Sequence, residues 1–417
     1  MEKAGGPIFG NPIMERNSEE RKATGWRIGI SICSILLGLV SFAPGQTRVE
    51  NPKRPLAKNA GRFVDLEEVL RIWDDGKNAI FRTPQSLALG NDGSLYFIDF
   101  AEGVRLYRFG PDGKLIFKTL KNGQGPGESQ YVNNFFFEGD KIRVQAWVPP
   151  KIIEFDFEGR YLREVPVRED THGLWCLAVA EGKIYGIRDE LFSSTAFHGA
   201  GTFPITNSVY EISSDFGNWR KLYEFPVRMG VKRAASNLGR FPARAVRLDM
   251  IDVAVHGSTM YILNTAKYGI TQLDLRTRRV ERFITRAYDR VKGKTGREAR
   301  RDPDPEARGF EDVDSDAYVF DINEIHAVGD NLWVFTSTVK PGGNDQQVDV
   351  FDASGRFIDS FFLRFPPGPR NHRSVRRKSL LTDDGFFFVP EQEEDGLVTI
   401  GKYKIRGFFQ PEQTSVS

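Results

Sequence analysis

Short apolar runs alternate with polar breakers along most of the chain, and the stretch Thr83–Glu128 shows this pattern most completely. Turns rich in glycine and aspartate separate four such runs within it. Runs and breakers of this kind predict four antiparallel strands. Because a single four-stranded sheet buries only one layer of contacts, the unit needs further copies of itself to be stable in water. The four runs are Ser86–Leu89, Ser94–Asp99, Arg105–Phe109 and Lys114–Leu120.

Five later segments repeat the central feature of this unit, which is an apolar strand, a tight turn and a second apolar or aromatic strand. Repeats at this spacing are typical of propeller blades rather than of sandwich strands. The sequence therefore predicts an all-β fold, a six-bladed β-propeller of four-stranded antiparallel blades. Together with Leu87–Asp99, the copies are Phe135–Trp147, Leu177–Asp189, Val253–Thr265, His326–Thr338 and Leu380–Gln392.

The last copy ends near Ile405 with only three clear strands, whereas an unassigned apolar segment, Arg62–Trp73, precedes the first copy. We expect this early segment to complete the last blade as its outer strand, because closing the ring removes exposed sheet edges. The sequence thus predicts a propeller over residues 62–406, closed by an N-terminal strand, and a C-terminal tail over residues 407–417.

Residues 1–45 read as a signal peptide or an N-terminal membrane anchor. The uncharged run Ile28–Ala43 follows a basic segment, and Gly45 offers a small residue for cleavage just ahead of Gln46. The run is shorter than the roughly 20 apolar residues that cross a bilayer, but an anchor at residues 28–43 is the alternative. We expect an exported protein, periplasmic or extracellular. Residues 46–61 are rich in proline, lysine and asparagine, and predict a flexible linker.

Composition narrows the function classes. Lysine and arginine total 58 against 56 acidic residues, a balance that argues against a nucleic-acid binder. The chain has two cysteines, Cys33 and Cys176, which exclude a disulfide framework. The 33 phenylalanines and 41 glycines fit an all-β fold with many turns.

The first repeat resembles an NHL repeat in its order of Pro84, a strand, Asp92-Gly93 and an aromatic strand ending at Asp99. The run Gly123–Glu128 is similar to a GxGPGE loop found in exported propellers. The chain thus looks like the bacterial exported six-bladed β-propellers, in the group that includes NHL-repeat and TolB-like propellers. The resemblance covers about residues 62–406 and implies fold and location more than activity, because one propeller fold carries many functions.

Residues near the start of each inner strand are expected to converge on the axial channel of such a ring. Asn134, Asp252 and Glu324 would then supply oxygen atoms from three blades, and oxygen is the ligand that Ca²⁺ prefers. This arrangement also resembles the metal site of lactonase-type propellers. Polar side chains around a hydrated channel need no metal, so Ca²⁺ is the alternative to a site without a cofactor.

Two histidines and one basic segment complete the candidates. His172 and His326 are expected near the mouth of the channel, although a buried histidine is commonly just hydrogen-bonded. The basic run before the last blade would meet an anionic partner, or form a solvated loop. Its candidate contact residues are Arg373, Arg376, Arg377 and Lys378.

The sequence contains no recognised catalytic or phosphate-binding motif in its expected strand-to-helix context. We therefore expect a non-enzymatic propeller that binds a protein, peptide or glycan partner through its loop faces. The first alternative is a metal-dependent hydrolase or lactonase that uses the channel carboxylates. The second is a scaffold subunit held at the membrane by its N-terminal segment. No catalytic residue is assigned.

Overall fold

The computed structural model describes residues 46–167, 174–189, 201–233, 243–292, 318–340, 345–366, 379–393 and 396–407. These residues belong to one compact unit, residues 44–417. They form strands and turns, and none of them lies in a helix that could span a membrane. The segment 28–43, predicted as a signal peptide or anchor, lies outside the described residues. The expected all-β class is confirmed.

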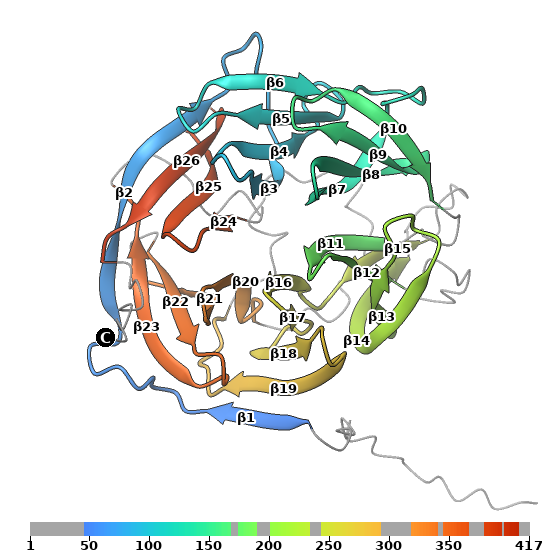
Figure 1. Ribbon diagram of the computed structural model, residues 1–417. Helices are drawn as coiled ribbons and strands as arrows, with labels where there is room; N and C mark the ends of the chain where they lie inside the picture. The colour runs from blue at the N-terminus through green and yellow to red at the C-terminus, as the bar shows by residue number, and fades with distance from the viewer. Residues whose placement is uncertain are drawn as a thin grey trace, which may run out of the picture. The chain divides into compact units, whose positions relative to one another are not determined.

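Antiparallel sheets follow one another around a ring, and the first strand of each lies nearest the centre (Figure 1). The turns form where the sequence predicts them. Gly93 has a φ of 79°, and Asp92 accepts the N–H of Ser94, so the Asp-Gly signature marks a tight turn. The first three blades comprise β3 (Gln85–Leu89), β4 (Leu95–Asp99), β5 (Arg105–Phe109) and β6 (Leu115–Thr119); β7 (Tyr131–Glu138), β8 (Lys141–Val148), β9 (Pro150–Asp156) and β10 (Tyr161–Pro166); and β11 (Leu174–Ala180), β12 (Lys183–Asp189), β13 (Gly201–Ile212) and β14 (Trp219–Arg233), with β15 (Ala243–Arg247) added outside.

The other three blades repeat this order but share strands from the N-terminal segment. They comprise β16 (Asp252–His256), β17 (Thr259–Leu263), β18 (Gly269–Asp274) and β19 (Arg279–Arg286), with β1 (Thr47–Asn51) outside; β20 (Ile322–Val328), β21 (Asn331–Val339), β22 (Gln346–Phe351) and β23 (Phe357–Arg364); and β24 (Leu380–Leu381), β25 (Phe386–Gln392), β26 (Val398–Ile405) and β2 (Arg62–Trp73). Six blades are therefore present, as predicted.

The strand β2 closes the ring. It begins parallel to β23 of blade five and continues antiparallel to β26 of blade six, so these two blades form one eight-stranded sheet. Arg71 fastens it, because its side chain is 5% exposed and forms an ion pair with the buried Glu391. The same guanidinium donates to Thr399 Oγ1 at 2.8 Å and to Tyr403 Oη at 3.0 Å. The predicted closure by an N-terminal strand is confirmed.

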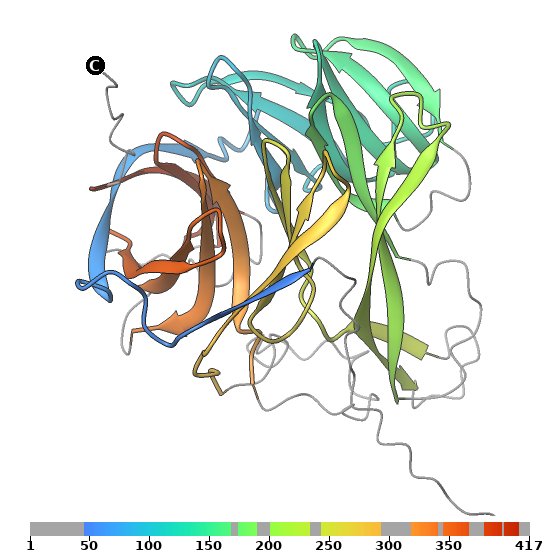
Figure 2. The same cartoon turned by 60° about the horizontal axis from the view of Figure 1, so that its bottom comes forward.

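The linker expected over residues 46–61 is where the structure differs from the prediction. Thr47–Asn51 form β1, which lies parallel to β19 of blade four (Figure 2). Asn51 Nδ2 donates to the carbonyls of Thr285 (3.0 Å) and Gly355 (2.9 Å), and its Oδ1 accepts the N–H of Phe357 (2.8 Å). Backbone pairing with blade four and hydrogen bonds of the Asn51 side chain to blade five thus order a polar segment. We call residues 47–73 the N-terminal belt.

The core is divided among the blade interfaces. In the described residues, buried apolar side chains form six clusters, and each cluster joins one pair of neighbouring blades. Between blades one and two, for example, Tyr96 and Leu106 pack with Phe135 and Val144. Since every blade depends on both neighbours for its buried area, the ring is stable only as a whole.

Candidate functional site

Hydrogen bonds between neighbouring blades place the starts of the inner strands side by side. Asn133 Nδ2 donates to the carbonyl of Leu174 at 3.0 Å and joins blades two and three. Asp252 accepts the N–H of Ile325 at 2.9 Å and joins blades four and five. Each bond links the first half of one inner strand to the first half of the next. We call this side of the ring the entry face.

Asp252 begins the inner strand β16, and Asn134 lies in the first half of the inner strand β7. Asp252 is 9% exposed, and its carboxylate also accepts the N–H of Val253 at 2.9 Å. Both of its oxygens thus bind backbone N–H groups. Asn134 lies opposite Gln145 in the register of β7 and β8 and is half-buried, while its neighbour Asn133 makes the bond between blades.

Glu324 and His326, predicted separately, lie together with Ser379 between blades five and six. Glu324 accepts the N–H of Ser379 at 2.6 Å and its hydroxyl at 2.9 Å. His326 Nε2 lies 3.0 Å from Glu324 Oε1 and 3.2 Å from Ser379 Oγ. In a nucleophilic triad, the acid and the hydroxyl occupy different ring nitrogens. Here they share one nitrogen, so the contact links blades five and six and does not have the geometry of such a triad.

No group of three or more His, Cys, Asp or Glu side chains that could hold a metal occurs in the part of the chain that the structure describes. Asp252 and Glu324 already accept N–H and O–H groups from the next blade. Because Ca²⁺ takes six to eight oxygen ligands, an ion in the channel would depend largely on water. The calcium site stays a hypothesis. His172 and the residues Arg373, Arg376, Arg377 and Lys378 lie outside the described residues.

Three aromatic side chains form a cluster on the entry face that the sequence reasoning missed. Phe100 follows β4, Tyr131 begins β7 and Trp147 lies near the end of β8. The rings of Phe100 and Tyr131 stack at 5.5 Å, and Tyr131 meets Trp147 edge-on at 6.5 Å. Tyr131 is 50% exposed. We call these three residues the aromatic platform. The sequence signal for this platform is that three strand ends on one face of the ring each carry an aromatic residue.

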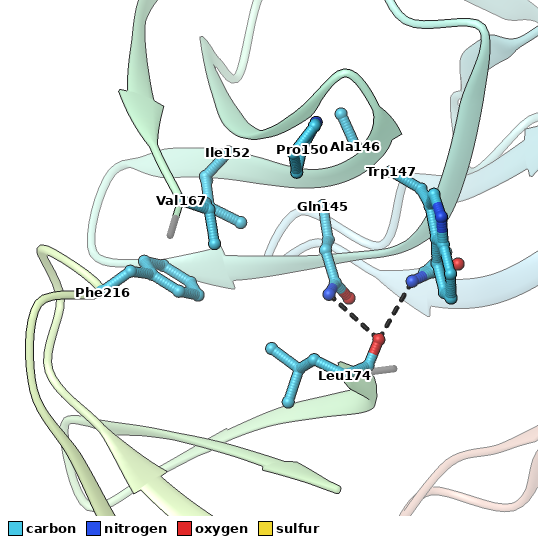
Figure 3. A pocket seen from close by; sticks show the side chains of 9 residues that line it. Gln145, Ala146, Trp147, Pro150, Ile152, Val167, Leu174 and Phe216 are labelled. Atoms are coloured by element: carbon cyan, nitrogen blue, oxygen red, sulfur yellow. Dashed lines mark hydrogen bonds between the residues drawn. The ribbon is translucent and has the colours of Figure 1, made fainter. Parts of the chain in front are cut away.

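A small cavity lies beside the platform between blades two and three (Figure 3). Its volume is about 10 Å³, and Trp147, Ile152 and Phe216 line it. Gln145 lies in it and donates from Nε2 to the carbonyl of Leu174 at 3.1 Å, while its Oε1 has no hydrogen-bond partner. A volume of this size holds about one water molecule, which could bind Gln145 Oε1. The cavity is therefore too small to be a ligand pocket.

The fold defines a six-bladed β-propeller, in which the starts of the inner strands gather at the entry face. Residues 84–194 match a family model described as a 6-bladed beta-propeller, which confirms the expected resemblance. No curated protein matches the chain.

Three solved structures are similar to the chain at low identity. A Bacteroides fragilis protein described as exported is 12% identical, covers 86% of this chain and 100% of its own, and gives a TM-score of 0.46. Virginiamycin B lyase from Staphylococcus aureus is 12% identical, with coverage of 80% and 98% and a TM-score of 0.40. A structure of a nidogen–laminin complex is 12% identical, covers 67% of this chain and 80% of its own, and gives a TM-score of 0.36. Similarity at this level carries no argument about activity.

Proposed function

We propose that the protein is an exported, non-enzymatic β-propeller that binds a protein, peptide or glycan partner on its entry face. The observation that carries the proposal is the aromatic platform, in which Tyr131 leaves half of its surface in contact with water. Exposed aromatic side chains supply contact area at a small entropic cost, since few of their torsions must be fixed on binding. Export rests on the order of basic and apolar residues before Gln46.

The contacts around the platform support binding by a rigid surface. Ser129 Oγ donates to the carbonyl of Tyr131 at 2.7 Å, and the N–H of Gln130 donates to the carbonyl of Val148 at 2.9 Å. These bonds fix the backbone on both sides of the tyrosine before any partner arrives. A surface ordered in advance loses less conformational entropy on binding.

The platform is tested with Tyr131→Ala and Trp147→Ala. Wild-type full-length chain and each variant are screened on a glycan array and against a random peptide library, and the affinity of each hit is measured. We expect each variant to weaken binding at least about tenfold, because losing a central aromatic contact costs roughly 1–2 kcal/mol or more. The matched control is Tyr161→Ala on β10, where the tyrosine is 43% exposed and lies away from the platform. Equal loss in the control, or none in the platform variants, would contradict the proposal.

The metal-dependent hydrolase is a second candidate, and only the contact of Glu324, His326 and Ser379 favours it. Its test is hydrolysis of simple esters and lactones, with and without added Ca²⁺, by wild type and His326→Ala. Turnover that depends on His326 and on the metal would put catalysis ahead of binding.

A further inference from the structure

Two cations and two phenylalanines meet on the entry face at the outer side of blade five. The start of β2 pairs with the end of β23, and Phe63 lies beside Phe362 in this register. Asp65 lies beside Arg364 in the same register, and Lys340 directly follows β21. Since β21 and β23 both end at the entry face, the side chains gather there. We call Phe63, Lys340, Phe362 and Arg364 the cationic patch.

The cations in this patch lie against aromatic rings. The Arg364 guanidinium carbon is 3.9 Å from the centroid of the Phe63 ring, and Lys340 Nζ is 4.4 Å from that of Phe362. The two rings are 6.0 Å apart, and Phe63 is 42% exposed. Cation–π contacts hold a charge in place without neutralising it. The patch therefore presents two oriented positive charges beside the exposed part of the Phe63 ring.

The charges in the patch are only partly balanced. The Lys340 ammonium has no carboxylate partner in the described part of the chain. The contact between Lys340 and Asp345 is a backbone hydrogen bond, from the N–H of Lys340 to the carbonyl of Asp345. Among the described residues, Arg364 pairs with the carboxylate of Asp65 at 3.5 Å, and both side chains are about half exposed. The charge of Arg62, which lies on β2 with Asp65, is balanced, because Arg62 binds the Asp359 carboxylate through two hydrogen bonds of 2.8 and 2.7 Å. Donor capacity thus remains on Lys340 and Arg364.

We propose that the cationic patch binds a carboxylated polysaccharide, a choice that rests on the proposed function of the entry face. The exposed part of the Phe63 ring packs against the apolar face of a sugar ring, while Lys340 and Arg364 beside it bind the carboxylates. Two cations make a small site, so useful affinity comes from the repeated charges of a polymer rather than from one sugar. A neutral glycan gains nothing from the two cations.

The test compares polygalacturonate with its methyl-esterified form, which differs in charge and not in backbone. Binding to full-length wild type is measured at low and high salt, next to Lys340→Ala, Arg364→Gln and the double variant. We expect wild type to bind the acid form alone, more weakly as salt rises, and the double variant to bind at least about tenfold more weakly. Arg356→Gln is the control, because Arg356 is 68% exposed, pairs with Asp352 and lies at the turn at the other end of blade five.

Three outcomes overturn the inference: no binding of polygalacturonate, equal binding of both polymers, or equal losses in the control and the patch variants. Thermal melts of each variant establish that it is folded. The platform variants Tyr131→Ala and Trp147→Ala separate this result from the proposed function. If they lose their partner while the patch variants keep theirs, the entry face still binds and only the role of the cationic patch is lost.

Discussion

Single side chains hold one blade to the next at the inner edge of the ring. Asp252 accepts an N–H group between blades four and five, and Glu324 accepts one between blades five and six. Asn133 donates between blades two and three. A buried N–H group that loses its acceptor costs about 1–3 kcal/mol. These residues therefore have a structural role, because their hydrogen bonds hold neighbouring blades together around the channel.

Asp252→Asn tests this role. The carboxylate accepts one N–H with each oxygen, whereas an amide has one oxygen and would direct its NH₂ group at the other donor. We expect the variant to be less stable by about 1–2 kcal/mol in urea denaturation, with or without Ca²⁺. A loss seen only with Ca²⁺ present would instead indicate a metal ligand.

A second test at this scale uses pH. Glu154 on β9 is fully buried, and burial alone would raise its pKa. Hydrogen bonds from Arg163 and Lys141 outweigh burial, and with the charge of Arg143 they lower the pKa from 4.5 to about 2. Because the folded-state pKa is the lower one, the carboxylate stabilises the fold above pH 4.5, and this contribution is lost as pH falls toward 2.

The corresponding prediction concerns Glu154→Gln. At neutral pH we expect it to be about 2–3 kcal/mol less stable than wild type. The difference should shrink below about pH 4.5, where the wild-type carboxylate begins to lose its advantage. Urea denaturation of both proteins from neutral to acid pH measures it. A gap that stays constant over that range would mean that packing, rather than charge, sets the cost.

At the scale of elements, the two strands of the N-terminal belt, β1 and β2, contribute unequally to the stability of the ring. The strand β2 buries Leu66 and Ile72 in two different core clusters and carries the Arg71 ion pair. The strand β1 is mostly exposed, and its buried anchor is Asn51. Ring closure therefore depends on β2, whereas β1 covers an edge that is already part of a complete blade.

Two internal deletions test this division. Removing residues 62–73 opens blade six and strips apolar surface worth about 25 cal/mol per Å², so we expect no cooperative melting transition. Removing residues 46–51 should lower the melting temperature by only a few degrees, since roughly 1–2 kcal/mol is lost. Thermal melts followed by circular dichroism compare the two. Similar melting of both deletion variants would show that the ring closes by other contacts.

The blade strands were predictable because their local pattern and their tertiary role agree. Turns such as Asp92-Gly93 and alternating apolar runs point to the same hairpins that the ring contains. The strand β1 was not predictable. Its sequence, TRVEN, lacks apolar alternation, and what orders it is the open edge of β19, more than 200 positions away by the spacing of Asn51 and Thr285.

At the scale of the whole molecule, the ring brings together residues that lie far apart in the sequence, because neighbouring blades contribute to the same site. Glu324, His326 and Ser379 meet only because blades five and six are neighbours, and Phe100 reaches Tyr131 across another interface. The sequence predicted that Glu324 and His326 lie near the channel, but not that they contact each other. Which side chains meet between blades depends on the angle and register of the sheets, which local patterns do not encode.

Ring closure by β2 also sets a schedule for the newly made chain. Arg71 and its partner Glu391 are 320 positions apart, so at about 5–20 residues per second the closing strand waits on the order of tens of seconds for its sheet to be synthesised. During that time a strand of 12 residues has both edges free. Asp65, Glu67, Glu68 and Arg71 interrupt its apolar positions. Charges at such positions disfavour the pairing of a free strand edge with other chains.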